Sequence, residues 1–157
     1  MKMKKKLRVY VDTSVIGGCY DDGFKEGSIR LIDEFKIGLH IPVISEITLE
    51  EMNRAPREVQ DVLVGLMDYD CEVVSETVES IELAQKYLAA EILSKNFEND
   101  ARHIAVAVTS NVDMVVSWNF KHIVHFDKIR QFNSVNIREG YKPIEIYSPR
   151  EVVSYEV

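Results

Sequence analysis

The chain has 157 residues, of which 46% are hydrophobic and 29% are charged. This composition is typical of a globular domain with its own core, and it excludes collagen-like and disulfide-dense proteins and argues against disorder. Nineteen basic against 26 acidic residues give a formal charge of −7. That balance argues against a protein that coats nucleic acid with a broad cationic surface, but it does not exclude nucleic acid as a substrate bound locally by a few cations.

The ends of the chain and its cysteines indicate the compartment. The lysines at positions 2–6 precede an apolar stretch that is too short for a secretory signal, and no window approaches the roughly 18 apolar residues of a membrane span. Cys19 and Cys71 are too few for a zinc quartet or a disulfide framework. We expect a cytoplasmic protein with reduced thiols, folded as a single domain over residues 1–157 with its core at about 7–147.

Short apolar runs alternate with helix-length segments along the chain. The runs predict strands at residues 7–11, 41–44, 73–74, 114–116 and 144–147. Apolar positions at helical spacing predict helices at residues 28–39, 45–53, 57–67, 78–93, 101–108 and 126–132. This alternation predicts an α/β fold with a mainly parallel central sheet.

Polar residues gather where the predicted strands end or the predicted helices start, the place where function collects in open α/β sheets. They are Asp12, Thr13 and Ser14, then Glu46, Glu50 and Glu51, then Asn99 and Asp100, and lastly Ser117, Trp118 and Asn119. Each carboxylate also has a structural explanation as a turn former, a helix cap or a solvated charge. Converging carboxylates would raise one another's pKa unless a cation neutralised them, and hard oxygen ligands suit Mg²⁺ or Mn²⁺.

Other catalytic motifs are missing from the sequence. It contains no P-loop, no dinucleotide-binding glycine pattern and no nucleophile elbow. His122 and His125 are interpreted as surface or loop residues, because their spacing matches no common zinc motif.

Four segments within residues 7–125 resemble, in order, the motifs of PIN domains: VYVDTSV at 9–15, SEITLEEM at 45–52, NDARHIAVA at 99–107 and SWNF at 117–120. The resemblance implies a three-layer α/β/α fold and a metal-dependent ribonuclease that acts on RNA. Many bacterial PIN domains are toxins of VapBC-type toxin–antitoxin pairs. An antitoxin partner and a homodimer are expected on the same basis.

The resemblance also assigns the metal ligands. Asp12, Glu51 and Asp100 would bind Mg²⁺ or Mn²⁺, with Glu50 as the second carboxylate if the register slips by one, and Glu46 as a weaker candidate. Many PIN domains carry a fourth acid where this chain has Asn119, which supplies an oxygen without a negative charge. Asn119 would then position water or substrate.

Substrate contacts are expected from several side chains around these carboxylates. The hydroxyl of Thr13 or Ser14 would hydrogen-bond the carboxylates or a phosphate. Trp118 is either a core or interface residue or a stacking platform for a base. The candidate phosphate contacts are Arg102, Lys121, Lys128 and Arg130.

Two functions follow from these features. The first is a Mg²⁺- or Mn²⁺-dependent endoribonuclease that hydrolyses a phosphodiester to a 5′-phosphate and a 3′-hydroxyl. The second is a weakly active or inactive PIN-like module that binds protein or RNA, which Asn119 and the charge of −7 favour.

Overall fold

The computed structural model describes residues 5–154, which contain one sheet of five parallel strands. The strands are β1 (Leu7–Val11), β2 (His40–Ser45), β3 (Glu72–Val74), β4 (Met114–Val116) and β5 (Glu145–Tyr147). Their spatial order is β3-β2-β1-β4-β5. The predicted parallel α/β fold is therefore confirmed.

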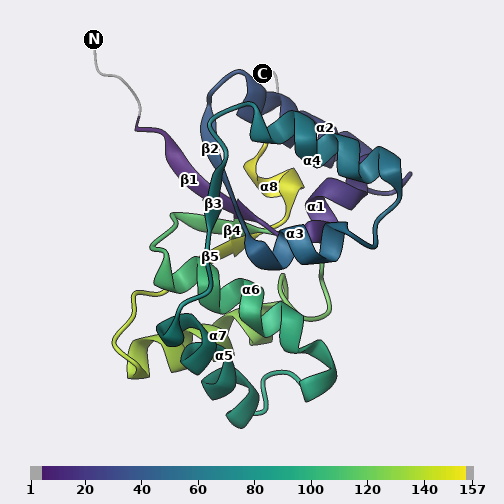
Figure 1. The fold of residues 1–157 in the computed structure, drawn as a ribbon. Helices are drawn as coiled ribbons and strands as arrows, with labels where there is room; N and C mark the ends of the chain where they lie inside the picture. Colours follow the sequence, from purple (N-terminus) through teal and green to yellow (C-terminus); the bar gives the residue numbers. More distant parts are fainter. Residues whose placement is uncertain (1–4, 155–157) are drawn as a thin grey trace.

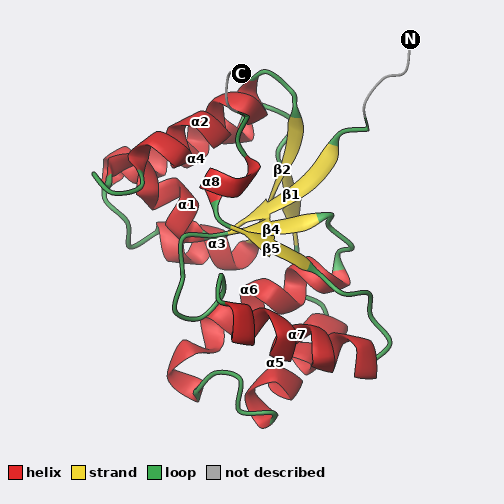
Figure 2. Cartoon of the chain, turned by 180° about the vertical axis from the view of Figure 1, so that it is seen from behind, coloured by secondary structure: helices red, strands yellow, loops and turns green. Residues whose placement is uncertain are grey.

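Helices cover both faces of this sheet (Figures 1 and 2). One face carries α1 (Thr13–Gly17), α2 (Lys25–Lys36), α4 (Arg57–Met67) and α8 (Pro149–Val152), and the other carries α5 (Val78–Ala89), α6 (Glu98–Thr109) and α7 (Phe126–Arg138). Helix α3 (Glu46–Met52) directly follows β2, and two short 3-10 turns, η1 (Gly18–Tyr20) and η2 (Lys95–Phe97), lie in connections. The three layers expected from the resemblance are present.

The strands read as continuous apolar runs because both of their faces are buried. Val9 and Val11 pack into the core beneath α2 and α4, whereas Tyr10 between them packs into the core beneath α5 and α6. Val43 and Ile44 divide in the same way. Strands β1 and β2 thus supply both cores in alternation.

Two predicted helices end early because the backbone turns. The helix predicted at 28–39 corresponds to α2, which ends at Lys36. Gly38, two residues later, has a φ of +81°, a backbone conformation that residues with an L side chain rarely adopt. The helix predicted at 78–93 ends at Ala89, shortly before Glu91 with a φ of +59°.

Two other helices are longer than predicted. Helix α6 begins at Glu98, so Asp100 lies inside its first turn instead of preceding it. Helix α7 continues to Arg138. The four- and five-residue helices α8 and α1 were not predicted, because so few residues show no periodicity.

The chain order reverses beside the central strand β1. From β1 the chain proceeds to β2 and β3 on one side, and later to β4 and β5 on the other. Such a switch point opens a crevice at the carboxyl ends of the strands. Asp12 follows β1 there, Ser45 ends β2 and Ser117 follows β4.

Both cysteines are free, as expected, and half-buried. Burial raises the pKa of each thiol to about 11, with Asp33 adding to the shift for Cys19 and Glu72 for Cys71. Because the thiolate is the reactive form, neither thiol is a nucleophile at neutral pH.

Candidate functional site

Asp12 occupies the switch point and is held by two serines. Its side chain is buried, Oδ1 accepts from Ser14 Oγ at 2.6 Å, and Oδ2 accepts from Ser117 Oγ at 2.7 Å. Burial raises the pKa of the Asp12 carboxyl and nearby Asp100 adds to the rise, while His103 and the serine hydroxyls oppose it. The structure thus fixes the orientation of a carboxylate in a place that disfavours its charge.

Glu51 enters the site from the last turn of α3. Its Oε1 accepts from Thr13 Oγ1 at 2.8 Å and from His103 Nε2 at 2.5 Å, while Oε2 accepts no hydrogen bond from a described residue. Burial by itself would raise the pKa of Glu51, but the contacts with His103 and Thr13 outweigh it and the pKa is lowered. Glu51 is the carboxylate that this environment keeps ionised.

Asp100 reaches the site from the first turn of α6. Its Oδ2 accepts from Asn119 Nδ2 and lies against His122 Nδ1, both at 3.2 Å. Burial raises the pKa of Asp100, His122 and His103 oppose the rise, and the charge of Glu51 adds to it. Oδ1 of Asp100 is free of hydrogen bonds from described residues.

The three carboxylates therefore share one electrostatic environment, although they come from three distant segments. Asp100 influences Asp12, Glu51 influences Asp100, and His103 acts on all three. Their oxygen donors, with the Asn119 amide, are chemically suited to Mg²⁺ or Mn²⁺, and a cation would relieve the repulsion that raises the pKa values. Within residues 5–154, however, no three His, Cys, Asp or Glu side chains lie close enough together to form a complete metal-binding site.

The alternative glutamates on α3 have other contacts. Glu50 is exposed and lies 3.7 Å from Arg102, whereas Glu46 Oε1 accepts from the backbone N–H of Glu76 at 2.7 Å. Neither contacts His103 or Thr13. Of the three glutamates on α3, Glu51 is therefore the one hydrogen-bonded to His103 and Thr13.

The expected phosphate contacts are largely engaged elsewhere. Arg102 donates through both Nε and Nη2 to Glu76 and through Nη1 to Asn99, so its guanidinium is used within the fold. Lys128 donates to the carbonyl of Ile92, and Arg130 lies over the ring of Phe126. Lys121 is exposed in the loop after β4.

A hollow of about 310 Å³ opens beside Glu51. It is lined by Thr13, Glu50, Glu51, Arg54 and Asn99. The exposed guanidinium of Arg54 makes no hydrogen bond or ion pair with any residue in 5–154. Sequence analysis missed Arg54, since an exposed arginine after a helix carries no signal of its own.

Trp118 belongs to the core, so it is not a stacking platform. Its side chain is 4% exposed, stacks on Phe24 with ring centroids 4.5 Å apart, and donates from Nε1 to Ser28 Oγ at 2.8 Å. Its backbone N–H donates to Ser14 Oγ at 2.9 Å. Trp118 thereby anchors the loop that carries Ser117 and Asn119.

Two histidines lie close to the carboxylates: His103, to which sequence analysis gave no role, and His122, which it interpreted as a surface or loop residue. His103 is buried one helical turn after Asp100, and His122 is half-buried against Asp100 and the ring of Phe97. His125, as expected, is exposed. The spacing of three residues between Asp100 and His103 places both on one side of a helix, which is the signal that was available.

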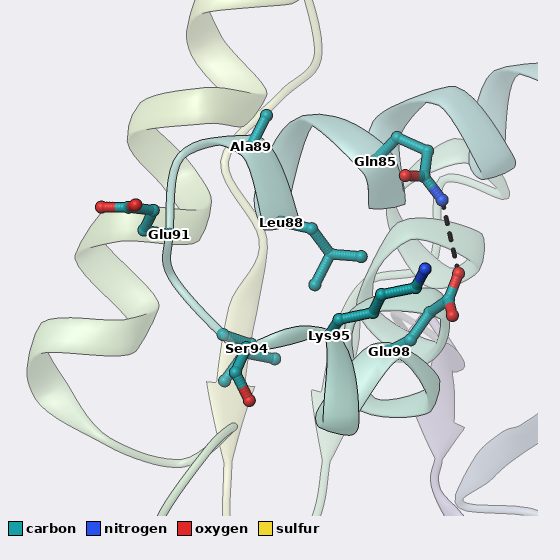
Figure 3. A pocket seen from close by; sticks show the side chains of 8 residues that line it. Gln85, Leu88, Ala89, Glu91, Ser94, Lys95 and Glu98 are labelled. Atoms are coloured by element: carbon teal, nitrogen blue, oxygen red, sulfur yellow. Dashed lines mark hydrogen bonds between the residues drawn. The ribbon is translucent and has the colours of Figure 1, made fainter.

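A larger hollow of about 770 Å³ lies between the end of α5 and the start of α6 (Figure 3). It is lined by Gln85, Leu88, Ala89, Glu91, Leu93, Ser94, Lys95 and Glu98. Its polar groups are partly paired with each other, as in the hydrogen bond from Gln85 to Glu98. It contains none of the three carboxylates, whereas the smaller hollow is lined by Glu51.

The architecture is that of a PIN-like α/β domain, as its similarity in fold to solved structures shows. The chain is similar in fold to VapBC2 of Rickettsia felis, solved bound to a DNA fragment from their promoter, with a TM-score of 0.61 and 13% identity over 90% of this chain and 98% of that one. It is also similar to VapC20 of Mycobacterium tuberculosis, a sarcin–ricin loop cleaving toxin, with a TM-score of 0.54 and 18% identity over 87% and 98% of the two chains.

No family model and no curated protein matches this chain. In the described range 5–154, no helix combines the length and apolar character that crossing a membrane requires.

Proposed function

We propose that this protein is a Mg²⁺- or Mn²⁺-dependent endoribonuclease of the PIN type. The observation that carries the proposal is that Asp12, Glu51 and Asp100, from three separate segments of a PIN-like fold, lie near His103, with Asp100 raising the pKa of Asp12 and Glu51 raising that of Asp100. The fold neighbours support a ribonuclease, since one of them is a toxin that cleaves the sarcin–ricin loop.

Asp12, Glu51 and Asp100 would hold the cation, with Glu51 Oε2 and Asp100 Oδ1 as the oxygens left open by the hydrogen-bonding pattern. When bound, the cation would supply Lewis acidity to the scissile phosphate and lower the pKa of an attacking water. The resulting products are a 5′-phosphate and a 3′-hydroxyl.

The protein's own contribution is orientation. Ser14 and Ser117 fix the plane of the Asp12 carboxylate. Asn119 ties the loop after β4 to Asp100, because its Nδ2 donates to that carboxylate while its Oδ1 accepts from the His122 backbone at 2.9 Å. Each carboxylate therefore keeps its position before substrate arrives, which reduces the reorganisation needed for the reaction.

The RNA substrate would enter through the hollow beside Glu51. Arg54 at its rim and exposed Lys121 would contact backbone phosphates, since Arg102 is already engaged with Glu76. With a charge of −7, the protein would bind RNA through these local contacts and the cation instead of a basic surface.

An antitoxin partner, a homodimer and a cytoplasmic location complete the proposal. The VapBC2 neighbour supports an antitoxin partner, because that structure is of a VapBC pair bound to a DNA fragment from their promoter. A gene encoding a small protein directly upstream would support the toxin role.

The test is cleavage of RNA with added Mn²⁺ by the wild type, Asp100→Asn and a matched control, Asp113→Asn. Asp113 accepts a hydrogen bond from the Arg8 backbone at 2.7 Å, outside the candidate site. We expect cleavage by the wild type and the control, abolished by chelation and by Asp100→Asn. Equal activity of the wild type and Asp100→Asn would overturn the proposal.

A second candidate is a PIN-like binding module with little or no activity. It is favoured by the neutral Asn119 in place of a fourth acid and by carboxylates that do not form a complete metal-binding site within residues 5–154. Calorimetric titration with Mn²⁺ separates the two candidates. Binding at millimolar or lower concentration supports the nuclease, and its absence supports the module.

A further inference from the structure

A buried chain of hydrogen bonds runs behind Glu51. Tyr10 on β1 is fully buried and its hydroxyl lies 2.6 Å from His103 Nδ1 and 2.8 Å from Ser45 Oγ. His103, which is 2% exposed, continues the chain from its other ring nitrogen to Glu51 Oε1. The chain joins β1, the start of α3 and the first half of α6.

The direction of the bond to Glu51 follows from chemistry. An ionised carboxylate only accepts, so His103 Nε2 carries the hydrogen that Glu51 receives. The other ring nitrogen, Nδ1, is hydrogen-bonded to the Tyr10 hydroxyl, which is joined in turn to Ser45 Oγ. The Ser45 oxygen also accepts the Ile47 N–H at the start of α3. Both ring nitrogens of His103 and the hydroxyls of Tyr10 and Ser45 thus have hydrogen-bond partners.

This arrangement decides which oxygen Glu51 presents. His103 and Thr13 both bind Oε1, so Oε2 is the oxygen left for a ligand. A free glutamate samples many rotamers, and fixing them in advance removes an entropy cost from binding. His103 also lies one turn from Asp100 on α6. The hydrogen bond from His103 to Glu51 therefore fixes the position of Glu51 relative to the helix that carries Asp100.

We propose that Tyr10 and His103 are positioning residues that hold Glu51 with Oε2 presented to a divalent cation. The inference rests on the proposed function and adds to it two residues that contact neither cation nor RNA. Loss of such supporting hydrogen bonds lowers metal affinity about 10- to 100-fold in other proteins.

The test uses two tyrosine hydroxyls of matched burial. Tyr10→Phe removes the hydroxyl behind His103. Tyr87→Phe removes the equally buried hydroxyl that bonds Asn136 in the packing of α5 against α7. We expect Mn²⁺ affinity, measured by calorimetry, to fall about tenfold or more in Tyr10→Phe and to stay within twofold of the wild type in Tyr87→Phe. Thermal unfolding of both variants reports the structural loss, which we expect to be similar.

A second measurement needs no variant. The ring nitrogens of His103, observed by NMR in the metal-free wild type, are expected to show hydrogen on Nε2. Adding diamagnetic Mg²⁺ should shift these signals and leave those of His40 unchanged, because His40 lies near Glu34 instead of the candidate ligands. If Tyr10→Phe does not fold, His103→Gln replaces it with the same expected loss of affinity.

Each outcome decides the matter. The positioning role would be overturned by any of three results: unchanged Mn²⁺ affinity in Tyr10→Phe, an equal loss of affinity in Tyr87→Phe, or His103 signals that do not shift at saturating Mg²⁺. The proposed nuclease activity would stand in each case. If the wild type itself neither binds Mn²⁺ nor cleaves RNA, the proposed function fails and the positioning role fails with it.

Discussion

The side-chain amide of Asn119 donates a hydrogen bond to Oδ2 of Asp100 over 3.2 Å, across the gap between the loop after β4 and the first turn of α6. An aspartate at position 119 would place a second negative charge at the same distance. Asn119 therefore stabilises Asp100, whereas an aspartate at position 119 would repel it.

The variant Asn119→Asp tests whether Asn119 stabilises Asp100 in this way. We expect it to lower the free energy of unfolding in chelator by about 1–3 kcal/mol, because Asp100 loses a hydrogen bond to its charge. We also expect tighter Mn²⁺ binding, since the number of ligand charges sets affinity for hard cations. Urea unfolding and calorimetry measure the two effects. Unchanged Mn²⁺ affinity would mean that position 119 does not face the cation.

Asp100→Asn is expected to abolish RNA cleavage and to raise the free energy of unfolding at neutral pH. Burial, together with Glu51, raises the folded-state pKa of Asp100, so the folded protein binds this proton more tightly than the unfolded chain does. The stability gained from the bound proton is complete below the unfolded pKa, about 4, and is lost as the pH rises through the folded value.

In chelator, the variant should therefore be more stable than the wild type at pH 7, and the difference should vanish below about pH 4. Thermal unfolding across this range measures it. A variant that is less stable at pH 7 would show that the contacts with His122 and Asn119 outweigh burial.

Arg54→Ala is expected to weaken RNA binding. Its guanidinium has no partner among residues 5–154, so its removal leaves the fold unchanged but takes one cation from the rim of the hollow. KM for RNA should rise several-fold, and the slope of binding against salt should fall by about one ion.

Arg102→Ala is the contrasting variant. It breaks the contacts with Glu76 and Asn99 and should lower thermal stability with less effect on KM. The assignment of Arg54 would be wrong if the two variants changed KM equally.

Gly18→Ala is expected to disturb the anchor of the site loop. A Cβ at Gly18 would lie 2.6 Å from Ser28 Oγ and 2.8 Å from Trp118 Nε1, inside the hydrogen bond that fixes Trp118. We expect a loss of about 1–3 kcal/mol from overpacking. The adjacent Gly17→Ala is the control, because its Cβ meets nothing within 4 Å and its helical backbone accepts alanine. Denaturant unfolding should separate the two, and equal stabilities would contradict the packing described for Trp118.

Local pattern was enough to predict most of the architecture. The β-branched run at 7–11 and the amphipathic segment at 57–67 match β1 and α4, because periodicity reports which faces of an element are buried. Parallel strands then bring their carboxyl ends to one edge, so Asp12 could be placed at a site from its position after a strand.

The identity of the groups that act together was decided only by tertiary structure. Glu50 and Glu51 are adjacent in the sequence and both line the hollow, yet only Glu51 is held by His103, 52 residues away, through its Oε1. Arg102 was expected to bind phosphate, but its guanidinium is paired with Glu76 on a separate segment. These outcomes depend on contacts between distant segments, whose distances and partners no local spacing encodes.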